Sequence, residues 1–308
     1  MAILRIMVGI PGSGKSTYAK EIQRDYQNWV VNSSDAIRAE LYGNEDDQSH
    51  NNEIFNTMLR RTVAALCAGI NCIYDATNLS AKRRANLIKE VRRQVKDVRY
   101  EAVVMATPID NCLVRNAARE RSVPTYVIFS MLKRFEMPAL WEGFDEIKVY
   151  GNDKPDGVLN ATELMHIAER MEQNNPHHTL TVGHHMQKAY TLYMTQFFDA
   201  NYWIAQAILW HDIGKIYCKT FTNMRGEATD IAHFYGHANV SAYIYLSLLA
   251  VANINGTLRG GDELVVNLIQ HHMDFFNDEK YLEKVKERYG DEFMKQLAIV
   301  HTYDSLAH

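Results

Sequence analysis

A glycine-rich loop near the start of the chain has the residue types and spacing of a phosphate-binding site, Gly9-Ile10-Pro11-Gly12-Ser13-Gly14-Lys15-Ser16-Thr17. Its glycines allow successive backbone N–H groups to face one anion, and the dipole of a following helix favours negative charge at the same point. Lys15 can neutralise the β- and γ-phosphates of a nucleotide, and the Ser16 hydroxyl can ligate Mg²⁺. We therefore predict that ATP or GTP binds here with Mg²⁺, held by the residues of the loop's second half: Gly12, Ser13, Gly14, Lys15, Ser16 and Thr17.

A second group of polar residues follows in the segment Asn32-Ser33-Ser34-Asp35-Ala36-Ile37-Arg38. Asp35 can accept the proton of an attacking hydroxyl, and Arg38, one helical turn further on, can hold an anionic acceptor. Capping of a helix by Ser34 or Asp35 is the alternative. Asp75, which follows another apolar stretch, can bind Mg²⁺ through water or orient an arginine. These residues predict an acceptor site opposite the phosphate loop.

Three arginines lie close together in the segment Arg115-Asn116-Ala117-Ala118-Arg119-Glu120-Arg121. Arg115 and Arg119 are four residues apart and would share one face of a helix, whereas Arg121 would begin a loop. Guanidinium groups this close repel one another unless they share an anion. We predict that Arg115, Arg119 and Arg121 form a lid that closes over the transferring phosphoryl group and stabilises its charge.

Histidine is concentrated in the second half of the chain. Of the 13 histidines, only His50 lies in the first half. The pair His211-Asp212 ends an apolar helical pattern and is followed by Lys215. Further candidates lie on other helical patterns: His184, His185, His233, His237, His271, His272, His301 and Asp304. Imidazole and carboxylate groups in such numbers suit Mn²⁺, Fe²⁺, Zn²⁺, Ni²⁺ or Co²⁺. The pattern predicts a metal site but leaves open which member of each His doublet binds, and His301 and His166 are equally compatible with an ordinary core histidine.

The first half alternates apolar strand-like segments with helical patterns, which predicts a parallel sheet covered by helices on both faces. The expected strands are 4–8, 29–31, 72–74, 98–106 and 146–150. The expected helices are 15–25, 36–41, 52–67, 81–95, 109–118 and 125–135. In sheets of this kind the functional groups gather at the carboxyl ends of the strands, and the polar residues of the first half do follow the expected strands.

From residue 163 onwards, apolar residues recur at intervals of three and four, which predicts an all-α domain. A turn-rich segment, 151–157, separates the two patterns and is the expected linker. We therefore expect an α/β domain over residues 1–152 and an all-α domain over residues 159–308.

The composition, 47% hydrophobic and 23% charged residues in a chain of 308, is that of a soluble globular protein with room for two cores. No apolar run approaches the roughly 18 residues that a membrane-spanning helix needs. A strand leads directly into the phosphate loop, which is unlike a signal peptide, and we expect a cytoplasmic protein that does not contact a membrane. The cysteines form no C-x-x-C pair, so we expect free thiols without disulfides.

The net charge of −4 conceals a basic segment, because residues 81–121 contain 11 Lys and Arg residues against 5 Asp and Glu residues. Its basic members include Lys82, Arg83, Arg84, Arg92 and Arg93. Such a segment is either a surface that attracts a polyanion or a solvated helix face.

The motifs GIPGSGKST, NSSDAIR, YDATN and VRNAARERSVP, in this order, resemble the kinase half of polynucleotide kinase-phosphatases of phage and bacterial type over residues 1–150. The resemblance implies transfer of the ATP γ-phosphate to a 5′-hydroxyl of RNA or DNA. It implies Lys15 and Ser16 as contacts to ATP and Mg²⁺ and Asp35 as the general base. It also implies that Arg38 contacts the 3′-side phosphate of the acceptor and that Arg119 contacts the ATP phosphates.

The motifs TVGHHM, LWHDIGK, FYGHANVSA, IQHHMDF and HTYDSLA resemble the HD-domain metal-dependent phosphohydrolases over residues 160–308. The resemblance implies that four side chains hold a first metal: His185, His211, Asp212 and Asp304. It implies a second metal at His237 and His272, with Asp212 as the bridge. In such a site a metal-bound water is the nucleophile near neutral pH, and Lys215 neutralises a phosphoryl oxygen.

Together the two resemblances predict a bifunctional enzyme that heals the ends of RNA or DNA, with a ligase as the expected partner downstream. The kinase would phosphorylate 5′-OH ends, and the second site would remove a 3′-phosphate or open a 2′,3′-cyclic phosphate. One alternative keeps the kinase and makes the second half a nucleotidase that acts on mono- or dinucleotides. Another is a nucleic-acid-binding protein in which ATP drives a conformational switch.

Overall fold

A parallel five-stranded sheet forms the centre of the first part of the protein. The computed structural model describes residues 1–45, 48–151, 159–176, 179–252 and 256–307. The strands are β1 (Ala2–Val8), β2 (Trp29–Ser33), β3 (Asn71–Asp75), β4 (Val98–Met105) and β5 (Glu146–Tyr150), and their order across the sheet is β2-β3-β1-β4-β5. β1 and β4 consist almost entirely of buried residues, as expected for strands covered on both faces. The predicted α/β architecture of this part is confirmed.

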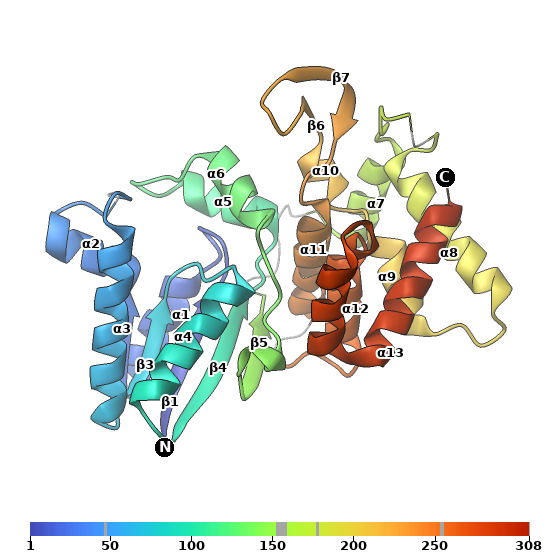
Figure 1. Ribbon diagram of the computed structural model, residues 1–308. Coiled ribbons are helices and arrows are strands. Elements are labelled where there is room, and N and C mark those ends of the chain that lie inside the picture. The colour runs from blue at the N-terminus through green and yellow to red at the C-terminus, as the bar shows by residue number, and fades with distance from the viewer. Residues whose placement is uncertain (46–47, 152–158, 177–178, 253–255, 308) are drawn as a thin grey trace.

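Helices cover both faces of this sheet (Figure 1). They are α1 (Lys15–Asp25), α2 (Ser34–Tyr42), α3 (Asn51–Cys67), α4 (Ala81–Gln94), α5 (Ile109–Ala117), α6 (Thr125–Leu132) and the 3₁₀ turn η1 (Leu140–Glu142). α6 ends three residues earlier than predicted, because Phe135 turns into the core and packs edge-on against Tyr243 of the second part. α2, α5 and α6 lie beside the carboxyl ends of the strands, where the phosphate loop also lies (Figure 1).

The second part is mainly helical. Its helices are α7 (Ala161–Glu169), α8 (Val182–Gln196), α9 (Tyr202–Trp210), α10 (Lys215–Cys218), α11 (His237–Ala252), α12 (Asp262–His271), the 3₁₀ turn η2 (Asp274–Phe276) and α13 (Glu279–Leu306). α9 and α11 are apolar on most of their surface because the other helices surround them. No helix among the described residues is both long enough and apolar enough to cross a membrane.

The prediction that the second part lacks strands is wrong at one place. β6 (Thr220–Thr222) and β7 (Ala228–His233) form an antiparallel hairpin. Its turn depends on Gly226, which has a φ of 84°, and on Asn223, whose side chain accepts hydrogen bonds from the backbone N–H groups of Arg225 and Glu227. These strands are too short to stand out from the surrounding helical periodicity.

The two parts share one hydrophobic cluster. It joins Val8, Ile10 and Val104 of the sheet region to residues of α8, α9, α11, α12 and α13. Hydrogen bonds between side chains and backbone groups also cross the boundary. The Gln270 side chain accepts from the Met137 N–H at 2.9 Å, and the Asn239 side chain donates to the Lys133 carbonyl at 2.8 Å. Residues 152–157 of the predicted linker, 151–157, lie outside the described residues, and the division into two domains stays a prediction.

Arg84 corrects the interpretation of the basic segment. Its side chain is fully buried and forms a bidentate ion pair with Glu142, with both N–O distances at 2.7 Å. Burial raises the pKa of Glu142, although the adjacent guanidinium opposes this shift. A pair satisfied on both sides in this way is a structural element of the fold, so Arg84 contributes nothing to a surface that attracts polyanions.

Candidate functional site

The phosphate loop adopts a conformation that only glycine tolerates at its critical positions. Gly12 has a φ of 81°, and a β-carbon there would lie 2.2 Å from the carbonyl oxygen of Cys112. Gly14, with a φ of 93°, is the N-cap of α1. The loop therefore leads directly into a helix N-terminus, whose unpaired N–H groups and dipole favour an anion.

Lys15, Ser16 and Asp75 meet at the base of this loop. The Lys15 ammonium donates to the Ile10 carbonyl at 2.8 Å, and the Ser16 hydroxyl donates to Asp75 at 2.8 Å. Burial lowers the pKa of Lys15, and the nearby charges of Asp75 and Asp35 oppose that shift. Burial likewise raises the pKa of Asp75, against the effect of Lys15 and Ser16. A hydroxyl and a carboxylate in contact beside a lysine form a site suited to Mg²⁺ and nucleotide phosphates.

Asp35 and Arg38 form an ion pair at the carboxyl end of β2. The Arg38 guanidinium donates to Asp35 at 2.8 Å and to the side-chain oxygen of Asn51 at 2.7 Å. The Arg38 side chain is only 6% exposed, whereas that of Asp35 is 54% exposed. The residue before α2 is Ser33 and no side chain caps the helix, so the capping role considered for Ser34 or Asp35 is not observed. Asp35 therefore has an accessible carboxylate, and Asn51 is a partner of Arg38 that no sequence pattern indicated.

The three arginines of the predicted lid lie in different environments. Arg115 is on α5, which ends at Ala117, so Arg119 and Arg121 belong to the segment that follows. Arg119 is exposed and near enough to Lys15 to lower its pKa. Arg121 forms an ion pair with Glu45 at 3.1 Å. Of the three arginines, Arg119 is the one whose charge acts on Lys15 of the phosphate loop.

Asn116 holds the segment that carries Arg119 and Arg121. Its buried side chain donates to the carbonyl of Val123 at 2.8 Å and accepts from the Val123 N–H at 2.9 Å. This pair of hydrogen bonds closes the segment into a loop of defined shape. The sequence analysis did not identify Asn116 as a site residue, because an asparagine on a helix has no distinctive spacing.

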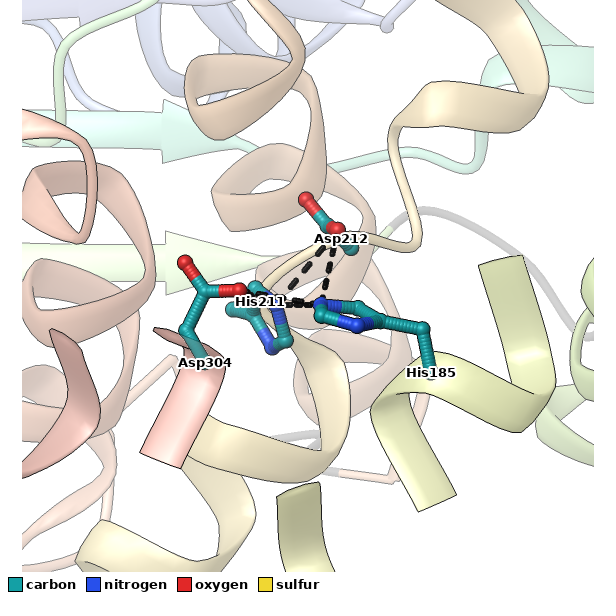
Figure 2. Close-up of side chains that lie close together, drawn as sticks. All are labelled: His185, His211, Asp212 and Asp304. Atoms are coloured by element: carbon teal, nitrogen blue, oxygen red, sulfur yellow. Dashed lines mark hydrogen bonds and ion pairs between the residues drawn. The ribbon is translucent and has the colours of Figure 1, made fainter. Parts of the chain in front are cut away.

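The second part brings together all six side chains that were predicted to hold metals. His185 of α8, His211 and Asp212 after α9, and Asp304 of α13 form one buried group (Figure 2). Asp212 belongs also to a second buried group, with His237 of α11 and His272 at the end of α12. Within each group the potential ligand atoms all lie within 4.8 Å of one another.

Asp212 lies between the two groups and directs one carboxylate oxygen towards each. Its Oδ2 is 3.4 Å from His211 Nε2 and 3.6 Å from His185 Nε2. Its Oδ1 is 3.1 Å from His237 Nε2 and 3.6 Å from His272 Nε2. One carboxylate oxygen of Asp212 therefore faces the imidazoles of each group.

Backbone carbonyl groups orient three of these histidines. The Nδ1–H groups of His211, His237 and His272 donate to the carbonyls of Ile208, Phe234 and Ile269, each three residues earlier, at 2.7 or 2.8 Å. Every Nε2 atom then turns towards the centre, which is how proteins orient imidazole ligands. The Nε2 atoms of His185 and His211 are 3.3 Å apart, and those of His237 and His272 are 3.1 Å apart. Imidazole nitrogens this close need a proton or a metal ion between them, and the histidine and carboxylate donor set fits a divalent cation.

The pKa shifts in this cluster reflect the same concentration of charge. Burial would lower the pKa of His211, but the carboxylates of Asp212 and Asp304 raise it to about 10. Burial opposes the ionised form of Asp212, yet Lys215 and His211 hold its pKa well below the usual range. Burial lowers the pKa of His237, although Asp212 opposes that shift. The charges of Lys215 and His211 thus favour the ionised form of Asp212.

The structure separates the members of each histidine doublet. His184 is exposed and contacts the Thr181 hydroxyl, whereas His185 points into the cluster. His271 pairs with Asp274 at 2.6 Å, whereas His272 points into the cluster. Three other histidines lie outside both groups: His166 pairs with Glu169, His233 stacks on Tyr235 and His301 packs against Phe275 and Phe276.

Lys215 reaches the cluster from the start of α10. Its ammonium lies 2.6 Å from Asp212 Oδ2 and donates to the side-chain oxygen of Gln173 at 2.8 Å. Both side chains are buried. Gln173 was missed by the sequence analysis, since it lies outside every recognised motif and contacts Lys215 only through the tertiary fold.

The first part of the chain is similar to known nucleotide-binding proteins. Residues 4–138 match the family model described as an AAA domain. The L-seryl-tRNA(Sec) kinase of Methanococcus maripaludis is 24% identical over 177 residues, which cover 56% of this chain but 64% of that relative. Among solved structures, the Pnkp1/Rnl/Hen1 RNA repair complex has 24% identity and a TM-score of 0.38, with 43% of each chain covered. A fungal RNA kinase has 13% identity and a TM-score of 0.40, with 53% of this chain and 79% of that chain covered.

The matched family model, the phosphate loop and the five-stranded parallel sheet together define the first part as a P-loop nucleotide-binding domain. The match ends at residue 138, before the helical part begins.

Proposed function

We propose that this protein is a two-site enzyme that heals nucleic-acid ends by adding phosphate at a 5′-OH and removing it at the other terminus. The observation that carries the proposal is the presence, in one chain, of a phosphate loop facing an accessible carboxylate and of a buried His/Asp cluster built for two cations. The phosphate loop with its facing carboxylate suits phosphoryl transfer, and the His/Asp cluster suits hydrolysis of a phosphate ester.

At the first site, Lys15 and the loop N–H groups bind the ATP phosphates, and Ser16 with Asp75 would hold Mg²⁺. Asp35 accepts the proton of the attacking 5′-hydroxyl as that oxygen forms its bond to the γ-phosphorus and ADP leaves. Arg38, which is fixed by Asn51, holds the acceptor's neighbouring phosphate, and Arg119 stabilises negative charge on the transferring group. The exposure of Asp35 supports this role, because a general base must be reached by the acceptor.

At the second site, His185, His211, Asp212 and Asp304 would hold one divalent metal, and Asp212, His237 and His272 would hold another. Metals bound there supply an activated water and stabilise phosphoryl oxygens. Lys215 binds a further phosphoryl oxygen, and its contact with Gln173 fixes the ammonium group at that position. The burial of the cluster excludes bulk water and strengthens every electrostatic interaction inside it.

The two activities suit one substrate. Cleavage of nucleic acid often leaves a 5′-OH together with a 3′-phosphate or a 2′,3′-cyclic phosphate, whereas a ligase needs a 5′-phosphate and a 3′-OH. A chain with both sites converts the first pair of ends into the second pair. RNA or DNA ends are the proposed substrate, and a ligase is the expected downstream partner.

One comparison favours a second acceptor for the kinase. The curated relative at 24% identity is named for phosphorylation of seryl-tRNA, in which the hydroxyl belongs to an amino acid on tRNA. An acceptor of this kind would also present a hydroxyl beside RNA phosphates. If seryl-tRNA is the acceptor, the kinase and the second site would act on two different substrates.

Competing substrates separate these possibilities. Transfer of the ATP γ-phosphate is compared among a 5′-OH oligoribonucleotide, a 5′-OH oligodeoxyribonucleotide, a nucleoside and seryl-tRNA. Metal-dependent phosphate release is compared between a 3′-phosphorylated oligoribonucleotide and mononucleotides. End healing predicts preference for the oligonucleotide in both series, and Asp35→Ala and Asp212→Ala should each abolish one activity alone. Preference for seryl-tRNA or for mononucleotides would contradict the proposal.

A further inference from the structure

We propose that Tyr243, a residue of the helical part, is a positioning residue for the phosphate loop of the first part. The proposal rests on the proposed binding of ATP at that loop. Tyr243 lies on α11, the helix whose first residue, His237, belongs to the His/Asp cluster, and α11 faces the α/β part (Figure 1). One helix would then serve both sites.

Two consecutive hydrogen bonds connect Tyr243 to the loop. The Tyr243 hydroxyl donates to the carbonyl oxygen of Thr107 at 2.8 Å. The Thr107 hydroxyl in turn donates to the carbonyl oxygen of Ser13 at 2.9 Å. Tyr243, Thr107 and Ser13 are all fully buried, so no water competes for these bonds.

The bond to Ser13 determines how the loop presents its backbone. In a trans peptide the C=O and the following N–H point in opposite directions. Fixing the Ser13 carbonyl against Thr107 therefore turns the Gly14 N–H away from Thr107, which leaves it available to an anion. Gly14 is also the N-cap of α1, so this N–H belongs to the group that the helix dipole makes attractive to phosphate.

A second contact reinforces the first through Cys112. The Cys112 thiol lies 3.5 Å from the same Thr107 carbonyl oxygen, and the Cys112 backbone packs directly on Gly12 of the loop. Burial and the neighbouring Cys112 raise the pKa of Tyr243, so its hydroxyl remains a proton donor at any physiological pH. Phe135 packs edge-on against the Tyr243 ring at 5.2 Å and holds it in place.

The test measures ATP binding to the full chain after Tyr243→Phe, with Tyr245→Phe as the matched control. Tyr245 is two residues away on α11 and also buried, but it packs on Trp210 instead of the phosphate loop. Loss of the Tyr243 hydroxyl leaves the buried Thr107 carbonyl with only the weak thiol contact of Cys112, so Tyr243→Phe should weaken ATP binding by about 5- to 30-fold. The KM for ATP should rise by a similar factor, while the metal content and the hydrolysis of 3′-phosphate ends stay at the wild-type level.

Two variants of Thr107 test the connection without touching α11. Thr107→Val removes the hydroxyl that binds Ser13 and should weaken ATP binding, whereas Thr107→Ser should restore it. The double variant Tyr243→Phe/Thr107→Val should lose less than the product of the two separate factors, since both act through one chain of hydrogen bonds.

Each outcome has a distinct meaning. If Tyr243→Phe binds ATP as tightly as Tyr245→Phe, or if Thr107→Ser fails like Thr107→Val, the positioning role is refuted while the kinase stands. If the wild-type chain itself does not bind ATP, the proposed kinase and the positioning role both fail.

Discussion

The two candidate sites differ in how their charged groups are satisfied. At the phosphate loop each group has a partner from the protein: Lys15 contacts the Ile10 carbonyl, Ser16 contacts Asp75, and Arg38 contacts Asp35 and Asn51. In the His/Asp cluster four imidazole Nε2 atoms and two carboxylates crowd together, and several of these atoms oppose groups of the same kind. The first site pairs its charged groups one by one, whereas the second concentrates imidazoles and carboxylates in one buried cluster.

This difference has a consequence for each reaction. ATP and the acceptor must displace existing contacts at the first site, so substrate binding assembles the catalytic arrangement. At the second site, residues on α8, α11 and α13 and at the ends of α9 and α12 place six histidine and aspartate side chains close together. Substitutions should therefore affect catalysis at the first site and metal content at the second.

The largest effect is expected for Asp212→Asn. The amide keeps the size of the side chain but removes the negative charge that faces both groups. Phosphate release from a 3′-phosphorylated oligonucleotide should fall on the order of 10³-fold or more, because the metals supply most of the acceleration. Elemental analysis should show the loss of bound metal, while 5′-phosphorylation continues. Retained metal and retained hydrolysis would refute the bridging role.

Asp35→Asn should have the next largest effect, and at the other site. Without a general base the rate of 5′-phosphorylation should fall by about 10²- to 10⁴-fold, with little change in ATP binding. Steady-state kinetics with a 5′-OH oligonucleotide measure this, and metal content serves as the control because it should not change. An unchanged kinase rate would exclude Asp35 as the base.

Gln173→Leu should have an intermediate effect on the second site. It removes the hydrogen bond that holds Lys215 but leaves every potential metal ligand in place. Groups that orient a catalytic site from outside typically contribute about 10- to 100-fold, and we expect a loss of hydrolysis in that range with normal metal content. A parallel loss of metal would show instead that Gln173 supports the cluster as a whole.

Asn51→Ala should have the smallest effect. It removes one of the two partners of the Arg38 guanidinium, and Asp35 still holds the other side. The KM for the oligonucleotide should rise by about tenfold, as expected for one hydrogen bond to a charged group, while the KM for ATP stays constant. A change confined to the KM for ATP would mean that Asn51 acts on the phosphate loop.

Much of the first part could be predicted because local patterns decide its elements. The strand 146–150 and the helix 15–25 begin and end where the sequence analysis placed them, and the phosphate loop lies between its strand and its helix as the motif requires. The histidines of the second part could be selected because imidazoles on apolar helices are unusual enough to mark a site. Their roles as ligands, like that of Asp35 as a base, stay predictions.

What the sequence did not reveal depends on contacts between distant segments. In the sequence Arg84 looks like its basic neighbours, but in the fold it is buried and paired with Glu142, 58 residues later. Gln173, Asn51 and Tyr243 are ordinary residue types at unremarkable spacings, and only tertiary packing brings them to Lys215, Arg38 and Thr107. The β6–β7 hairpin was missed because two short strands leave a weak pattern.

The most direct test follows both ends of one molecule. An oligoribonucleotide with a 5′-OH and a 2′,3′-cyclic phosphate is incubated with the protein, ATP, Mg²⁺ and Mn²⁺, and fragment masses report each terminus separately. The account predicts a 5′-phosphate and an opened or phosphate-free 3′ end, with Asp35→Asn blocking only the first change and Asp212→Asn only the second. Two unchanged ends, or the loss of both changes in either variant, would contradict it.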